Sequence, residues 1–549
     1  MKFTLSWLKQ HLDTSADAET IAKVLTDIGL EVEQIEDRAK DLAPFTVGYV
    51  VEAAPHPNAD KLRVCKVDTG KGIVQVVCGA PNARTGMKGV FAPPGSFIPG
   101  TKLDLKPGII RGVESNGMLC SMREMGLGQD HDGIIDLAAD APVGQSFATY
   151  MGFNDPVFEI KLTPDRADCL GVHGVARDLA AAGLGTLKPF EVGRIEGTFE
   201  SPLQWKRTDC GDACPLVVGR LYRIAKNSPS PQWLQERLTA IGLRPISALV
   251  DITNYVTFDL GRPLHVFDAD KVTGHPTMRM ARAGEKLLAL DGFEYELEPG
   301  MVVIADDSQV EAIGGIMGGQ LSGVSATTKS VFLEVALFDP AVTARTGRKL
   351  GINSDARYRF ERGVDPESAE WGVDVATKLI LELCGGEASH ITRAGKMPDW
   401  HRKITFRPDR VEGLGGVALP VARQKDILSK LGFGAAETSA AHWTVTPPSW
   451  RADVEGEADL VEEVLRINGF DNIPVVSLPK LSALPHPAID AQQRRVPIAK
   501  RLLATRGLLE AVTFSFMPSA IAKLFQAAKT GNAELVMLAN PISADLDAM

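Results

Sequence analysis

Hydrophobic periodicity divides the chain into segments that favour helices and segments that favour strands. Between residues 39 and 148, short apolar runs separated by Gly, Pro and Asn indicate closely spaced strands, as in a small closed barrel. Elsewhere, apolar residues recur at intervals of three and four, which favours amphipathic helices. The predicted helices cover 17–28, 172–182, 365–384, 459–468 and 491–506. A further strand is predicted over 507–516, in the segment GLLEAVTFSF.

Length and patterning together predict a multidomain α+β protein. With 549 residues and 44% hydrophobic content, the chain can form about three to five domains, each with its own core. The final residues, DLDAM, complete no element, and we therefore expect an incomplete last domain. The predicted units are an N-terminal α+β domain (1–38 and 149–199), an inserted barrel (39–148), a large α/β module (200–400), a small helix and strand module (401–476) and the start of a last domain (477–549).

Several compositional features bound the class of protein. No apolar run approaches the roughly 18 residues that span a bilayer, and the first residues do not form a signal-peptide core, so we expect a cytoplasmic protein. The seven cysteines are scattered without paired CxxC spacing, which indicates reduced thiols.

The distribution of charge points to one local surface. The net charge of -10 argues against a general nucleic-acid binder. Between Lys61 and Arg111, however, nine basic residues stand against two acidic ones, a local balance of 9 − 2 = +7. A solvated barrel surface explains this charge as well as RNA binding does, because small barrels host several classes of ligand.

A group of carboxylates around the predicted helix 459–468 is a candidate metal site. Asp459, Glu462 and Glu463 fall at i, i+3 and i+4 and therefore share one face. Asp453, just upstream, can supply a fourth oxygen, and such a set suits a hard cation such as magnesium. The alternative is a solvated acidic face on which Arg466 pairs with Glu462 or Glu463.

The large module holds a second candidate site. Glu334 lies among apolar neighbours in a predicted strand, where a carboxylate must be hydrogen-bonded or shift its pKa. A structural role remains open for Glu334 and also for His265, which fits a core histidine. Gly318 belongs to a glycine-rich segment that lets the backbone approach a ligand. Arg166, Asp168 and His173 lack metal spacing and a nucleophile, which favours a structural interpretation.

Several motifs resemble those of one protein family. PSWRADV and DLVEEVLRINGFDNIP closely resemble the magnesium-carrying module of bacterial phenylalanyl-tRNA synthetase beta subunits. HPNADKL, VVCGAPN and IIRGVESNGMLCS resemble an OB-fold tRNA-binding module that several synthetases share. ISALVDITNYVTFDLGRPLHVFDADKV, AIGGIMGGQLSG, VFLEVALFDP and RKLGINSDARYRFERGVDP resemble the family's editing domain. The segment after residue 476 resembles the start of its catalytic-like domain, a class II synthetase-like antiparallel sheet.

The resemblance implies specific residues and partners. It places magnesium on Asp453, Asp459, Glu462 and Glu463. It places the editing site on Arg244, Thr253, Asn254, Pro263, His265, Gly318, Glu334, Ser354 and Ala356.

The implied activity is that of a phenylalanine-tRNA ligase subunit. The chain would join an alpha subunit in a heterotetramer of two alpha and two beta chains, bind tRNA and hydrolyse mischarged Tyr-tRNA. ATP would bind as a substrate on the alpha subunit. The rival hypothesis is a non-catalytic tRNA-binding scaffold protein, and the motif at 447–474 argues against it because free-standing tRNA-binding proteins do not need that module.

Overall fold

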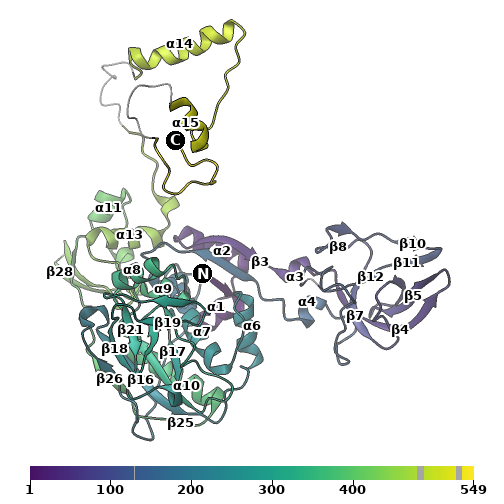
Figure 1. Cartoon of the computed structure of the whole chain (residues 1–549), viewed down its shortest axis with the longest axis horizontal. Coiled ribbons are helices and arrows are strands. Elements are labelled where there is room, and N and C mark those ends of the chain that lie inside the picture. Colours follow the sequence, from purple (N-terminus) through teal and green to yellow (C-terminus); the bar gives the residue numbers. More distant parts are fainter. Residues whose placement is uncertain (129, 440, 479–487, 527–534) are drawn as a thin grey trace. The chain divides into compact units, whose positions relative to one another are not determined.

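The computed structural model describes residues 1–128, 130–439, 441–478, 488–526 and 535–549 (Figure 1). Contacts between Cα atoms divide the chain into two compact units, Met1–Pro474 and Val475–Met549. Within the described residues, no helix is both long enough and apolar enough to cross a membrane.

A small antiparallel sheet joins the two ends of the N-terminal region. Its strand order is β1 (Lys2–Thr4), β13 (Val157–Lys161) and β3 (Glu31–Glu36), so a strand that follows the predicted barrel pairs with the first residues of the chain. Helices α1 (Leu5–His11), α2 (Ala18–Asp27) and α5 (Val172–Ala181) supply much of the local core. The predicted helices at 17–28 and 172–182 are therefore confirmed. The carboxylate of Asp17 caps α2 by accepting the N–H of Thr20 at 2.8 Å.

The segment predicted to be rich in strands forms a five-stranded antiparallel sheet. Its strand order is β12 (Met118–Leu119), β7 (Lys88–Ala92), β4 (Thr46–His56), β5 (Ala59–Asp68) and β6 (Ile73–Cys78). Two hairpins accompany this sheet, β8 (Phe97–Ile98) with β9 (Leu103–Asp104) and β10 (Gly108–Ile110) with β11 (Val113–Ser115). The N–H of Asn116, near β12, donates to the carbonyl oxygen of Gln75 on the opposite edge strand, β6, at 2.8 Å.

The large module contains two larger sheets and a two-stranded sheet of β19 (Lys286–Leu288) and β20 (Glu294–Glu296). The first has the order β17 (His265–Asp268), β24 (Ser330–Ala336), β16 (Leu216–Arg223) and β25 (Glu387–Ala388), and β26 (Thr392–Gly395) also pairs with β16. The second has the order β15 (Lys206–Arg207), β18 (Thr277–Met280), β21 (Val302–Ala305), β22 (Val310–Ile313) and β23 (Met317–Gly318). The helices are α6 (Gln232–Ala240), α7 (Ala248–Leu260), α8 (Pro340–Leu350), α9 (Asp355–Phe360) and α10 (Ser368–Cys384).

Strand β24 shows how this module is layered. Successive side chains of a strand point to opposite faces of its sheet. Val331, Leu333 and Val335 pack in one core with residues of α7 and α10. Phe332 and Ala336 pack in another core, with residues of the second sheet. Glu334 lies two positions from both Phe332 and Ala336, so its side chain is on the same face of β24 and faces the second sheet.

The region from 401 to 474 combines a three-stranded sheet with helices. The strand order is β27 (Ile404–Phe406), β29 (His442–Thr446) and β28 (Gly434–Ser439), and the helices are α11 (Arg410–Gly415), α12 (Val421–Lys430) and α13 (Glu457–Asn468). The predicted helix at 459–468 is confirmed as part of α13. Gly469, at φ 94°, ends it, in a conformation that side-chain-bearing residues rarely adopt.

The unit from Val475 contains two described helices, α14 (Ala491–Thr505) and α15 (Ser519–Gln526). The first confirms the prediction of a helix that includes Pro497. The strand predicted over 507–516 is wrong, because these residues form none and Leu509, Val512 and Phe514 are 97%, 93% and 86% exposed. The antiparallel sheet expected after residue 476 stays a prediction. The described part of this unit holds only isolated bridges, and residues 479–487 and 527–534 lie outside the described residues.

Candidate functional site

Glu334 and His265 form the centre of the candidate site in the large module. The two residues are direct register partners on the antiparallel strands β24 and β17. His265 has the parity of Phe267, which packs with the second sheet, so both side chains face the space between the sheets. The structure therefore brings together two predicted site residues that lie 69 positions apart in the sequence (334 − 265).

Burial governs the electrostatics of this pair. It raises the pKa of Glu334 to about 7, and the nearby guanidinium of Arg262 opposes this shift only in part. Burial also lowers the pKa of His265 to about 4, so the imidazole is neutral at pH 7. The enclosed Nε2 of His265 has no hydrogen-bond partner among the described residues. An unpaired polar atom beside an acidic group of raised pKa is typical of a binding or catalytic site.

Gly318 lies against His265. A Cβ atom built on Gly318 would stand 2.4 Å from Cε1 and 2.8 Å from Nε2 of the imidazole. Ser354 caps α9 by accepting the N–H of Arg357 at 3.1 Å, and its hydroxyl donates to the carbonyl oxygen of Ile316 at 2.7 Å. Ala356, in the same helix, packs partly buried against the core that Glu334 faces. These predicted residues thus lie on the same side of the first sheet as Glu334.

Two other predicted residues belong to the opposite side. Thr253 and Asn254 lie on α7, whose apolar residues pack with the other face of β24. The hydroxyl of Thr253 donates to the carbonyl oxygen of Val250 at 2.7 Å. Arg244 is exposed in the loop before α7. Buried Pro263 lies between α7 and β17. The structure does not gather Thr253 and Asn254 on the side of the sheet that Glu334 faces.

Two of the four carboxylates predicted to hold magnesium have arginine partners. Arg451 donates to Asp453 at 2.9 and 2.7 Å and also contacts Glu463. Arg466 donates to Glu463 through two bonds of 2.9 and 2.7 Å. The two guanidinium groups hold the pKa of Glu463 far below its usual range, against the effect of burial. The alternative prediction, an ion pair between Arg466 and Glu463, is confirmed.

The other two predicted ligands have separate environments. Asp459 accepts the N–H groups of Glu455 and Gly456 at 2.8 and 2.9 Å, so it caps the start of α13. Glu462 is exposed, but partial desolvation of its carboxyl and the neighbouring charge of Glu463 raise its pKa. Among the described residues, the only group of three potential ligands with atoms within 4.8 Å of one another is Asp168, Cys169 and Asp178.

Arginine side chains also bind the carboxylates of that group. Arg166 binds Asp168 through two bonds of 3.0 Å and binds Asp178 at 2.7 Å. Arg466 reaches the same oxygen of Asp178 at 2.7 Å. As arranged here, the four predicted ligands do not fit one shared ion, and the magnesium site stays a prediction. Sequence analysis missed Asp178 because the sequence gives no signal for a partner 288 residues away from Arg466. It also missed Arg451, although this residue lies only two positions before Asp453.

The motifs of the strand-rich region meet along the β10–β11 hairpin. The imidazole of His56 lies 3.1 Å from the carbonyl oxygen of Ile110, and the amide of Asn58 donates to that of Arg111 at 3.0 Å. The N–H of Val77 donates to the hydroxyl of Ser115 at 3.0 Å. HPNADKL, VVCGAPN and IIRGVESNGMLCS therefore contribute to one structural feature.

The basic residues of this region are mostly available for a partner. Lys66 pairs with Glu52, Arg84 pairs with Asp136, and Lys88 binds carbonyl oxygens. The other six are exposed and form no ion pair within the described part of the chain; they are Lys61, Arg63, Lys71, Lys102, Lys106 and Arg111. Lys102 and Arg111 have φ angles of 55° and 47°, a conformation that non-glycine residues adopt rarely and that is common near functional sites.

Comparison with known protein families assigns each of these regions. The B3/4 domain model matches residues 213–385, the model described as "Putative tRNA binding domain" matches 45–146, and the tRNA synthetase B5 domain model matches 404–470. The phenylalanyl tRNA synthetase beta chain CLM domain model matches 475–549. Together, these matches define a subunit of the aminoacyl-tRNA synthetase class.

Whole-chain relatives narrow this class. The phenylalanine–tRNA ligase beta subunits of Paramagnetospirillum magneticum and Rhodospirillum rubrum are each 56% identical to this chain over its whole length, which spans 68% of theirs. The chain belongs to the phenylalanine–tRNA ligase beta subunit family. A solved N-terminal fragment of the beta subunit from Pyrococcus horikoshii covers 57% of this chain and 88% of its own at 16% identity, with a TM-score of 0.31 that is too low to inform the fold.

Proposed function

We propose that this chain acts as the beta subunit of a phenylalanine–tRNA ligase, together with an alpha subunit that binds ATP and phenylalanine. Two copies of each subunit would form the enzyme. The chain would bind tRNA and hydrolyse tRNA that carries tyrosine in place of phenylalanine. Its identity with named beta subunits supports the first part of this proposal. The observation that carries the hydrolytic part is the buried carboxyl of Glu334 opposite His265.

Recognition of tyrosine would depend on its hydroxyl. A pocket built for phenylalanine rejects an added hydroxyl by only about 100-fold, so a second site must select for that group. Glu334 accepts a hydrogen bond from the tyrosine hydroxyl in this proposal, which offsets the cost of burying its carboxylate. Phenylalanine leaves the same carboxylate unpaired, at a cost of about 1–3 kcal/mol or more. The correct product is therefore spared.

The neighbours of Glu334 would shape the pocket. Gly318 and Ala356 keep it open because a larger side chain at either position would enter it. The neutral imidazole of His265, with its free Nε2, is placed to hydrogen-bond the attacking water or the terminal adenosine of the tRNA. Ser354 keeps its hydroxyl near the glycine-rich segment through Ile316. Arg244, Thr253, Asn254 and Pro263 complete the proposed site, with roles toward the tRNA end rather than the tyrosine ring.

The strand-rich domain would bind tRNA through phosphate contacts. We assign it the OB-type barrel, supported by the hydrogen bond between the segment near β12 and strand β6. Its six unpaired basic residues can displace counterions from phosphates, which gives affinity without a sequence preference. The fixed positions of Lys102 and Arg111 favour a defined docking geometry.

We propose that magnesium binds to this chain only in the assembled enzyme. The four carboxylates Asp453, Asp459, Glu462 and Glu463 would have to exchange arginine and backbone partners to share an ion. The hydrolytic reaction proposed above assigns no step to the metal.

Deacylation of Tyr-tRNA by the complex with the alpha subunit tests the proposal. Ala356→Trp should abolish hydrolysis by filling the pocket, with phenylalanine charging nearly unchanged. Glu334→Ala should weaken the discrimination between Tyr-tRNA and Phe-tRNA. If both variants clear Tyr-tRNA at the parent rate, the hydrolytic site lies elsewhere. If the parent enzyme itself hydrolyses no Tyr-tRNA, the chain acts as a tRNA-binding scaffold.

A further inference from the structure

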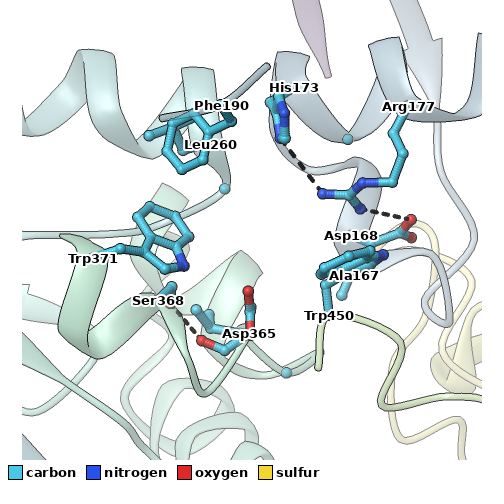
Figure 2. A pocket seen from close by; sticks show the side chains of 14 residues that line it. Ala167, Asp168, His173, Arg177, Phe190, Leu260, Asp365, Ser368, Trp371 and Trp450 are labelled. Carbon is cyan, nitrogen blue, oxygen red and sulfur yellow. Dashed lines mark hydrogen bonds and ion pairs between the residues drawn. The ribbon is translucent and has the colours of Figure 1, made fainter. Parts of the chain in front are cut away.

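A cavity of about 110 Å³ lies between helix α5, helix α10 and the segment before α13, and none of the residues that line it is assigned above to editing, metal or tRNA binding (Figure 2). Four parts of the sequence supply its walls, around residues 167–190, 260–261, 363–371 and 450. The residues on which the argument rests are His173, Arg177, Phe190, Asp365, Trp371 and Trp450.

Aromatic rings form much of the wall. The ring centroids of Phe190 and Trp371 lie 5.3 Å apart at 79°, and those of Phe190 and His173 lie 5.1 Å apart. The guanidinium of Arg177 stands 4.0 Å from the ring centroid of Trp450. Phe190 is 39% exposed, so it forms a rim through which a small molecule can enter. Such walls favour a flat ring, which stacks on them or meets them edge to face.

Two buried donors in this wall lack hydrogen-bond acceptors. The Nη2 of Arg177 lies 3.5 Å from Nδ1 of His173, and a guanidinium can only donate, so Nδ1 is the acceptor and Nε2 carries the proton. Neither that Nε2 nor the Nη1 of Arg177 has a hydrogen-bond partner in the described parts of the chain. Buried donors are rarely left unpaired, and two beside one cavity indicate an absent acceptor.

Charge and size restrict the ligand further. The positive charge of Arg177 is partly offset by Asp168, which also binds Arg166 and whose carboxylate oxygen lies 3.9 Å from Nη1 of Arg177. Asp365 lines the opposite wall, and burial raises the pKa of its carboxyl, which favours the uncharged form of this side chain. The site therefore offers hydrogen-bond donors without excess positive charge. The volume of about 110 Å³ is below the roughly 150 Å³ of an apolar cavity known to hold benzene, so the ligand is no larger than a single ring, held in part at the open rim.

We propose that this cavity binds a neutral, planar, single-ring ligand that carries a carbonyl acceptor, the chemical class of pyrimidine bases and aromatic amides. The ring lies among Phe190, Trp371 and Trp450. Its carbonyl oxygen accepts hydrogen bonds from Nε2 of His173 and Nη1 of Arg177. The ligand is either a free small molecule or an unstacked base of bound RNA.

Titration of the complex with the alpha subunit tests this assignment, with uracil as the probe and toluene as a ring without an acceptor. Uracil should bind saturably, as measured by calorimetry. His173→Phe keeps a ring but removes the donor. The affinity for uracil should therefore fall about tenfold, which is the effect of one buried hydrogen bond. Toluene binding should be unchanged by this variant. The matched control His390→Phe alters an exposed histidine elsewhere and should change neither.

A second variant tests the proposal independently, in case His173→Phe fails to fold. Ala167→Leu fills the cavity from a half-buried position and should abolish uracil binding at an unchanged melting temperature. Displacement of uracil by tRNA would identify a base of RNA as the ligand, whereas simultaneous binding would identify a free molecule. The proposal is overturned if uracil shows no saturable binding up to about 10 mM, a generous limit for so small a ligand. It is also overturned if Ala167→Leu binds uracil as the parent does.

Discussion

His265 and Glu334 face each other across strands β17 and β24, and burial moves their pKa values in opposite directions, to about 4 and about 7. Each shift favours the neutral form of its side chain. The two groups therefore do not form an ion pair, which would require both side chains to be charged. Two buried side chains whose charged forms are both disfavoured contribute little to the stability of the fold. This fits a role for the pair in binding.

Replacement of Glu334 by glutamine should make the stability of the protein less sensitive to a rise in pH from about 4.5 to about 7. The folded protein keeps a proton on Glu334 that the unfolded chain releases above its ordinary pKa of 4.5. Stability is thus lost as the pH rises from about 4.5 through about 7, by at most about 3 kcal/mol. Glu334→Gln should have a higher melting temperature than the parent at pH 8 and a similar one at pH 4.5. The control Glu382→Gln, at an exposed position of α10, should follow the parent at both pH values; a variant at Glu334 that does the same contradicts the assigned burial.

Gly318→Ala should disable hydrolysis of Tyr-tRNA through a single methyl group. The new Cβ would stand 2.4 Å from the imidazole of His265, so the ring must move out of its position beside Glu334. We expect at least a tenfold loss of hydrolysis, equivalent to about 1.4 kcal/mol in the barrier, with phenylalanine charging unchanged. Gly413→Ala, where nothing lies within 4 Å of the added atom, is the control. Full activity of the Gly318 variant would show that the position of His265 does not matter.

Glu463→Gln should destabilise the protein strongly, because it leaves the buried guanidinium groups of Arg451 and Arg466 without their shared carboxylate. Breaking one partner of a buried ion pair costs about 3–5 kcal/mol. Glu462→Gln, one position away and exposed, should change the melting temperature little. Melting curves with magnesium and with a chelator separate the two interpretations of this cluster. A shared magnesium ion predicts that the chelator lowers the melting temperature of the parent and that both variants lose this response.

Neutralising Arg111 should weaken tRNA binding in a salt-dependent manner. Arg111 is exposed at the tip of the β10–β11 hairpin, which His56 and Asn58 hold in place. If it contacts a phosphate, Arg111→Ala should flatten the slope of log affinity against log salt by about one. Lys378→Ala removes an exposed charge from α10 and should leave the slope unchanged. Equal slopes for the parent and the Arg111 variant would place the phosphate contact elsewhere.

The sequence by itself determined the elements whose signals are local. Asp17 and Gly29 delimit α2, and Gly469 ends α13, because caps and positive φ angles act within one turn of chain. The motifs also led to the correct family, since they record long, specific runs of residues.

Tertiary structure alone decided which carboxylates are free. Arg466 and Asp178 are 288 residues apart, and the pattern around α13 gives no sign that a distant acid shares its arginine. Tertiary structure likewise decided that Glu334 faces His265 while Thr253 and Asn254 do not, because sheet pairing sets the face of each residue. The failed strand at 507–516 has the same cause. A strand needs a partner to satisfy its backbone hydrogen bonds, and an apolar run by itself does not supply one.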